Sequence, residues 1–280
     1  MEHLRWSSRP ALRRPVVIAA FEGWNDAGDA ATTAARWLRE RWAPRPVADI
    51  DPEDFFDFTS VRPMVRLDEH EIRHIEWPAN DVTSGGGAGR DVLVLVGTEP
   101  QLRWRTFCEQ VVGVATALDA GLVVLLGALL AEVPHSRPIN VHGTASDPEV
   151  AARFGFVPSR YEGPTGIIGV LADACRRAGI PSVSLWASVP AYVPGAPSPK
   201  AALALVERTA ELIGVEAEPI DLHIASAAYE RQVDEVVAAD EETREYVEEL
   251  ERRYELGDED DEPVSLVEEV ERYLRDHGRE

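Results

Sequence analysis

The sequence predicts an α/β protein with a mainly parallel β-sheet and helices on both faces of that sheet. Short, continuously apolar runs recur along the chain, and segments with helical spacing of apolar residues separate them. Runs of this kind are typical of strands buried on both faces, as in parallel sheets. With 45% hydrophobic residues over 280 positions, the chain can form one large core without disulfides or metals.

The individual elements follow from these patterns. Buried strands are expected at residues 15–21, 91–97, 122–127 and 181–189. Helices are expected at residues 27–42, 102–118, 165–178 and 199–213. Before residue 77, β-forming residues interrupted by prolines indicate shorter strands, in which His70 and His74 lie on an exposed charged edge. The run 84–89 is rich in glycine and lacks the context of a dinucleotide-binding turn, so a mobile loop is expected there.

Composition divides the chain into a basic N-terminal tail (residues 1–14), an α/β body (15–226) and an acidic helical extension (227–280). The extension holds 21 acidic and 7 basic residues. We expect one helix over about 227–254 and, after a break at 257–263, a short helix over 264–274. A thin apolar seam lets the extension pack on the body or on a partner helix, and its other face is solvated. A solubilising appendage is favoured over an acidic docking arm.

Charge and cysteine content exclude several classes of protein. A net charge of −22 argues against broad nucleic-acid binding, which needs a positive surface. Cys108 and Cys175 lie in apolar contexts without a CxxC motif, so buried reduced thiols are expected. The most apolar stretch, 121–133, is too short to span a bilayer, and no stretch resembles a signal peptide. We therefore expect a cytoplasmic protein with no membrane partner.

The segment FEGWNDAGDA at residues 21–30 follows the first strand, where ligands bind in parallel α/β sheets. It contains no Lys or Arg, and its carboxylates would repel phosphate, so a phosphate-binding loop is disfavoured. A capping role for Asn25 or Asp26 at the following helix is the preferred interpretation. The candidate ligand-binding residues of this segment are Glu22, Gly23, Asn25, Asp26 and Gly28.

Two further turns follow the same logic. Gly163, Thr165 and Gly166 lie where a predicted helix begins; Thr165 suits an N-cap or first-turn position, and the glycines admit close backbone approach. Capping is favoured over ligand binding there too. Glu99 follows the second strand, where an acid or base can act; capping a helix or pairing with Arg103 is the structural alternative.

The segments after the strand at 122–127 carry His135, Arg137 and His142, which we expect in loops. They form the best polar cluster for a small anionic ligand. Two histidines without a suitably spaced carboxylate do not predict a metal site, and no HExxH motif occurs. No GxSxG motif occurs either, and neither cysteine has an adjacent His or Lys to activate it. No cofactor is therefore expected.

Six ordered segments together resemble the proteasome assembly chaperone 2 (PAC2) family, in its actinobacterial branch. They lie at residues 21–31, 62–65, 97–104, 134–147, 161–171 and 184–193. The resemblance implies a three-layer α/β/α fold akin to phosphorylases and peptidyl hydrolases, homo-oligomers, and, for eukaryotic and archaeal relatives, a role in assembling the 20S proteasome. The chain departs from the family in lacking a C-terminal hydrophobic-Tyr-any tripeptide and in having Ala191 where relatives carry His.

The expected function is a non-catalytic, protein-binding or assembly-chaperone-like role, with self-association (a trimer suits this fold group) and proteasome subunits as the candidate partner. The alternative is a small-molecule site for a nucleoside or anion, or a hydrolase- or phosphorylase-like enzyme, built from loops at the strand ends. In that alternative Glu99 or His135 would be the acid–base group and Arg137 would hold the anion.

Overall fold

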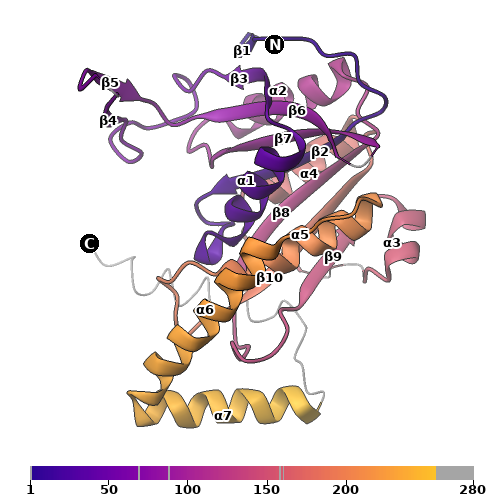
Figure 1. Ribbon diagram of the computed structural model, residues 1–280. Coiled ribbons are helices and arrows are strands. Elements are labelled where there is room, and N and C mark those ends of the chain that lie inside the picture. The colour runs from indigo at the N-terminus through magenta and orange to yellow at the C-terminus, as the bar shows by residue number, and fades with distance from the viewer. Residues whose placement is uncertain (1, 69, 88, 158, 160, 257–280) are drawn as a thin grey trace.

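The computed structural model describes residues 2–68, 70–87, 89–157, 159 and 161–256 (Figure 1). In this part of the chain, eight strands form one sheet in the order β1-β3-β6-β7-β2-β8-β10-β9. The strands are β1 (Leu4–Trp6), β2 (Val16–Glu22), β3 (Arg45–Ile50), β6 (Asn80–Gly87), β7 (Arg90–Thr98), β8 (Leu122–Ala131), β9 (Val141–Ala145) and β10 (Ser182–Pro190). The neighbours β7, β2, β8 and β10 are parallel, and the outer strands pair antiparallel. The expected parallel core is thus confirmed within a mixed sheet.

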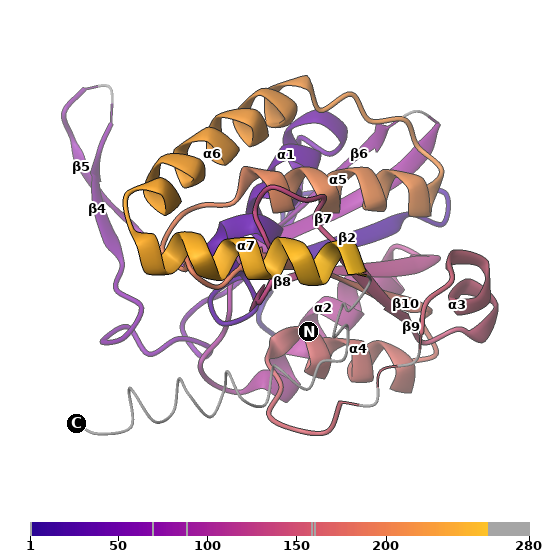
Figure 2. The same cartoon turned by 90° about the horizontal axis from the view of Figure 1, so that it is seen from below.

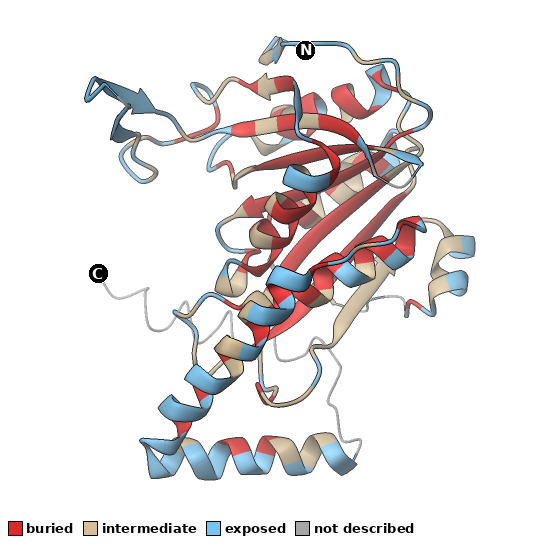
Figure 3. Cartoon of the chain, in the orientation of Figure 1, coloured by how far each residue is buried: buried red, intermediate tan, exposed pale blue. Residues whose placement is uncertain are grey.

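Helices cover both faces of this sheet, as the sequence predicts. They are α1 (Ala30–Trp42, after the 3-10 turn η1, Ala27–Asp29), α2 (Trp104–Ala117), α3 (Pro148–Phe154), α4 (Ile167–Arg177), α5 (Pro199–Ile213), α6 (Ile220–Ala238) and α7 (Glu241–Leu256). Successive residues of a strand point to opposite faces. In β2, Ile18 belongs to the apolar cluster with α1 and α5. Phe21 belongs to the cluster with α2 and α4. The buried central strands lie between these layers (Figure 3).

The expected loop at residues 84–89 is wrong. Residues 80–87 form β6, which pairs antiparallel with β7 from Asn80 to Gly87. The glycines there serve packing, because a Cβ at Gly85 would lie 2.0 Å from the carbonyl oxygen of Trp42 at the end of α1. Small residues in this strand therefore let α1 approach the sheet closely.

The single helix expected over 227–254 is also wrong, because the chain turns between α6 and α7 at residues 239–240. The Asp240 carboxylate accepts hydrogen bonds from the Thr243 backbone N–H (2.9 Å) and hydroxyl (2.6 Å), which caps α7. The proposed boundary at residue 227 falls inside α6. Figure 2 shows α7 lying across the molecule beside α6. The expected helix at 264–274 lies outside the described residues.

Two short strands, β4 (Met64–Leu67) and β5 (Arg73–Glu76), form a separate hairpin that projects from the body (Figure 1). This agrees with the predicted short strands, and His74 lies in β5 with its side chain exposed. At the other end of the chain, β1 lies within the expected basic tail and pairs with β3.

The remaining expectations concern the cysteines and membrane spans. Cys108 and Cys175 are both buried and free, as predicted, and burial raises the pKa of these thiols to about 12 and about 11. Among the described residues, none of the helices is both long and apolar enough to cross a bilayer.

Candidate functional site

Three of the sequence motifs meet at the side chain of Glu99, which follows the end of β7. One carboxylate oxygen, Oε1, accepts hydrogen bonds from Asn25 Nδ2 (2.8 Å) and from the Ile167 backbone N–H (2.9 Å). The other, Oε2, lies 3.3 Å from the Trp24 backbone nitrogen. Glu99 therefore caps α4 and ties it to the turn after β2. The expected partner Arg103 instead pairs with Asp54, at 2.9 Å.

Asn25 and Gly166 are in direct contact at this meeting point. Asn25 is 1% exposed, and a Cβ at Gly166 would lie 2.3 Å from its Nδ2 atom. Glycine is therefore required at residue 166, which is the N-cap position of α4. Thr165, expected at the N-cap or in the first turn, lies one residue before it. Asn25 Oδ1 is buried and has no hydrogen-bond partner among the described residues.

The other residues of the turn after β2 make structural contacts. Glu22 forms an ion pair with Arg36 of α1. Gly23 and Gly28 have φ values of +127° and +58°, which favour glycine. The Gly28 carbonyl accepts a 2.7 Å hydrogen bond from the backbone N–H of Ser198, the residue that caps α5. Gly163 lies in the segment before α4, where a Cβ would meet the Tyr161 hydroxyl at 2.5 Å.

Asp26 caps α1, as the sequence suggests. Its Oδ1 accepts hydrogen bonds from the backbone N–H groups of Ala31 (2.7 Å) and Thr32 (3.1 Å), and its Oδ2 accepts one from the Thr32 hydroxyl. Burial raises the pKa of Asp26 from 3.8 to about 6, although these hydrogen bonds oppose the shift. The native state therefore binds a proton here over a pH range in which the unfolded chain does not.

This buried carboxyl predicts a pH-dependent stability. Because the pKa of Asp26 is about 6 when folded and 3.8 when unfolded, its contribution is greatest below pH 4 and is lost as the pH rises through 6. Asp26→Asn removes this titration and keeps a capping oxygen. Between pH 4 and pH 7, the stability of the wild type should fall relative to the variant by about 2 kcal/mol. Urea unfolding of both proteins at four pH values measures this, and parallel pH profiles would refute it.

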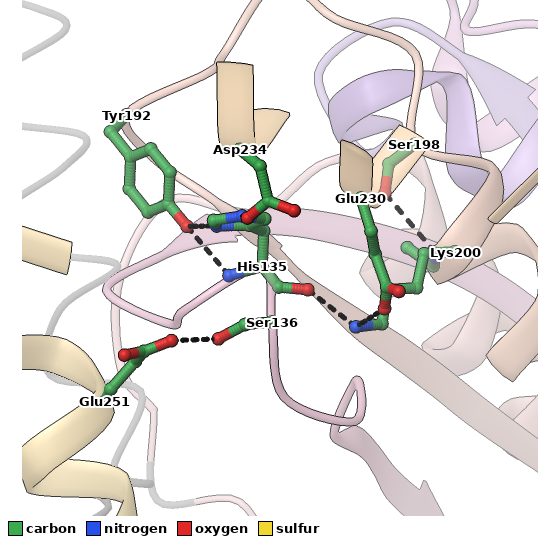
Figure 4. Close-up of polar contacts among 9 residues, drawn as sticks. His135, Ser136, Tyr192, Ser198, Lys200, Glu230, Asp234 and Glu251 are labelled. Atoms are coloured by element: carbon green, nitrogen blue, oxygen red, sulfur yellow. Dashed lines mark hydrogen bonds and ion pairs between the residues drawn. The ribbon is translucent and has the colours of Figure 1, made fainter. Parts of the chain in front are cut away.

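A second polar cluster surrounds His135, which is 2% exposed and follows β8 (Figure 4). Its Nδ1 lies 2.7 Å from the Tyr192 hydroxyl, and its Nε2 lies 3.0 Å from Asp234 Oδ1 of α6. The backbone N–H of His135 donates to the same Tyr192 hydroxyl at 2.7 Å. The Lys200 ammonium donates to the His135 carbonyl at 2.6 Å and forms an ion pair with Glu230 of α6. Every polar group of this histidine is thus engaged within the chain.

Residues 132–137, here called the 132–137 loop, also contact α7. Ser136 donates a hydrogen bond to Glu251, and Arg137 pairs with Glu255 at 2.6 Å. Glu132 accepts from Arg253 at 3.1 Å. Carboxylates of the helical extension thus pair with His135 and Arg137, two of the residues that the sequence suggested as ligands for an anion.

His142 does not join this cluster. It lies in β9, the edge strand beside β10, and not in a loop as expected. Its Nε2 atom is 3.5 Å from the Ser188 hydroxyl oxygen. The structure therefore brings together His135 and Arg137 but separates them from His142.

An apolar cluster supports these polar contacts. Its buried members come from α6 and α7, and its partly buried members come from the segment after β10. They are Tyr229, Val233, Val237 and Val247, packed against Tyr192, Val193 and Ala196. The valine seam is visible in the sequence, but its docking partners are not. Burial is also the main cause of the raised pKa of Tyr192.

The described residues contain no group of three or more His, Cys, Asp or Glu side chains that could hold a metal ion. The geometry at Glu99 and His135 is that of helix capping and helix docking. These contacts attach α6 and α7 to the α/β body. They leave the outer acidic surface of α7 open to solvent.

Comparisons with known proteins agree with this fold. The model of the PAC2 family matches residues 20–237. A PAC2 family protein from Streptomyces avermitilis is 46% identical, covering 83% of this chain and 99% of its own, with a TM-score of 0.78. A proteasome-assembly chaperone homologue from Mycobacterium tuberculosis is also 46% identical over the same shares, with a TM-score of 0.75. An archaeal proteasome activator from Pyrococcus furiosus shares the fold at 14% identity, with a TM-score of 0.68 over 83% of this chain and 97% of its own. None of the curated proteins compared matches the chain.

Proposed function

Because the chain belongs to the PAC2 family, we propose that it is an assembly-chaperone-like protein that binds subunits of the 20S proteasome through α7. A 46% identical structure bears the description proteasome-assembly chaperone homologue, which makes proteasome subunits the first partner to test. We also propose a cytoplasmic location, because the protein would have to be in the same compartment as the proteasome subunits that it binds.

The single observation that carries the proposal is the two-sided character of α7. Its inner side buries Val247 and Leu250. Its outer side is acidic, and there Glu242 and Glu245 are exposed and have no ion-pair partner among the described residues. Tyr246, 37% exposed, directly follows Glu245 and packs edge-on against Tyr192. A rigid acidic surface with an aromatic side chain suits a basic partner surface.

The candidate catalytic groups favour this role over catalysis. Glu99 makes three contacts to backbone or amide nitrogens. His135 is held by Tyr192 and Asp234. Both side chains therefore position helices, and one of these helices, α7, presents a surface that is available for a partner.

The proposal is tested by affinity purification of tagged full-length protein from its own cells, with mass spectrometry of the eluate. Wild type should recover proteasome subunits, and Glu242→Lys/Glu245→Lys should recover at least about 10-fold less, since like charges disfavour a basic partner. Recovery should also fall with added salt, because exposed charges are screened. The matched control is Glu109→Lys/Glu149→Lys, which makes the same charge change on α2 and α3. Equal recovery by both double variants, or no subunits with wild type, would contradict the proposal.

One observation favours a second candidate, a small-molecule site at the ends of β2 and β7. Asn25 Oδ1 is buried without a partner, and the turn at 23–28, Glu99 and Gly166 converge beside it. This candidate predicts that a nucleoside, phosphate or a related anion raises the melting temperature of the full-length protein. A ligand at 100 times its Kd would add about 2.7 kcal/mol of stability. Melting curves that stay unchanged across such a panel would exclude the ligands tested.

A further inference from the structure

We propose that the β4–β5 hairpin is a self-association arm, whose apolar face packs into the groove between β3, β6 and the hairpin base of a second copy of this chain. This inference does not rest on the proposed function, because it requires no client protein. It concerns a different part of the molecule from α7, at the opposite end of the view in Figure 1.

The hairpin exposes an apolar face that none of the other described residues covers. Val65 pairs with Ile75, and Leu67 pairs with Arg73, so these four side chains share one face. The three apolar members are 50–62% exposed. A two-stranded hairpin with strands of four residues is marginally stable in water on its own. Burying this face against another surface would stabilise it.

The hairpin is attached to the body at a defined contact. Trp77, directly after β5, packs edge-on against Phe58 with ring centroids 4.8 Å apart. Trp77 also lines the groove, so the hairpin starts at the groove's own rim and points away from the body (Figure 1). The apolar face of one copy therefore does not fill the groove of the same copy.

The groove has a partly apolar lining that carries more acidic than basic side chains, the basic ones being Arg5 and Arg39. Its volume is about 710 Å³, and its lining includes Pro44, Pro46, Val82 and Pro78. Acidic residues gather on it, among them Asp49, Asp51 and Asp81. Asp49 and Asp51 already pair with Arg5.

Asp81 is the carboxylate that lacks such a partner among the described residues. It is partly buried, and no hydrogen bond or ion pair of its side chain is present there. Burial is the main cause of the raised pKa of Asp81; the charge of Arg39 in the same groove opposes the rise, and the charge of Asp49 adds to it. A cation brought into the groove would stabilise its charged form.

The hairpin supplies such a cation. Arg73 lies on the apolar face beside Leu67 and is exposed, and no carboxylate pairs with it among the described residues. Within the described residues, one chain thus carries an apolar face with an unpaired guanidinium and a groove with a carboxylate that makes no ion pair. Complementary surfaces on the same chain can be satisfied by exchange between copies, either reciprocally in a dimer or around a ring.

The first test is the association constant of the full-length protein, measured by sedimentation velocity. Protein concentrations of about 1–100 μM cover the dissociation constants expected of a small protein–protein interface. Wild type should self-associate, and Leu67→Ser/Ile75→Ser should weaken association at least about 10-fold. The matched control, Ile220→Ser/Ile224→Ser, removes two equally exposed isoleucines from α6 and should leave association unchanged. Because the hairpin lies outside both core clusters, the melting temperature of the body should stay constant in either variant.

The second test is a charge exchange between the two proposed surfaces. Arg73→Glu and Asp81→Lys should each weaken association about 10-fold, and the double variant should recover most of the loss, since the pair is restored with reversed sign. A monomeric wild type across the range, insensitivity to the hairpin substitutions, or no recovery in the double variant would each overturn the proposal. The α7 variant Glu242→Lys/Glu245→Lys should associate like wild type, so failure of the client proposal would leave this result intact.

Discussion

Replacing Gly85 by alanine is expected to lower the free energy of unfolding by about 3 kcal/mol, at the upper end of the cost of overpacking. The added Cβ would lie 2.0 Å from the Trp42 carbonyl oxygen and 2.9 Å from the Ala43 Cα atom. Both contacts are with backbone at the end of α1, which cannot move aside as a flexible side chain would. The helix must shift away from β6, and this disturbs the core cluster that contains Trp42 and Ala43.

The neighbouring glycine provides the control. A Cβ at Gly86 meets nothing closer than 3.7 Å. Gly86→Ala should therefore change stability little, or increase it slightly by restricting the unfolded chain. Urea unfolding of the two variants beside wild type measures the difference. Equal stability of the two variants would show that α1 does not pack on β6 as described.

Replacing His135 by alanine is expected to release α7 from the α/β body. The substitution removes the contacts to the Tyr192 hydroxyl and to Asp234, and it leaves a cavity beside Tyr192. The Tyr192 hydroxyl keeps its hydrogen bond from the residue 135 backbone N–H, and the exposed Asp234 carboxylate returns to water, so the main loss is the packing of the buried ring that holds α6. Amides of α7 should exchange with solvent at least about 100-fold faster, which corresponds to about 2.7 kcal/mol of local stability.

The matched control is His142→Ala, the same substitution on the edge strand β9. It should leave exchange in α7 at the wild-type rate, because the hydrogen bonds that join α6 and α7 to the 132–137 loop within the described residues are made by other side chains. Hydrogen exchange followed by mass spectrometry resolves α7 from the rest of the chain. Unchanged protection of α7 in His135→Ala would mean that the Val247 contacts and the side-chain contacts from the 132–137 loop hold the helix without the histidine.

The central part of the fold was predictable from the sequence because its signals are local. The runs at 15–21, 91–97, 122–127 and 181–189 all became parallel central strands, since a strand buried on both faces is continuously apolar. Strand β6 was not predicted because its glycine content suggested a loop. Gly85 is instead required by the close approach of Trp42, a residue distant in sequence. The turn before α7 carries a local signal, the capping Asp240, but a continuous acidic helical composition obscured it.

For the candidate site residues too, local roles could be predicted from the sequence and long-range contacts could not. Glycines and capping carboxylates near strand ends were recognisable, and Asp26 caps α1 as expected. That Glu99 would cap α4 depends on two segments 68 residues apart meeting in space. The partners of His135, namely Tyr192 and Asp234, lie 57 and 99 residues away, and no spacing rule connects them. Long-range polar networks of this kind require the tertiary structure.

The central claim, that α7 presents a surface for proteasome subunits, is tested most directly with purified components. Full-length protein is mixed with separately purified, unassembled 20S α and β subunits, and the complexes are measured by native mass spectrometry. The account predicts a stoichiometric complex with unassembled subunits, which Glu242→Lys/Glu245→Lys abolishes and Glu109→Lys/Glu149→Lys retains. Absence of a complex with wild type, or a complex that both variants form equally, would contradict it.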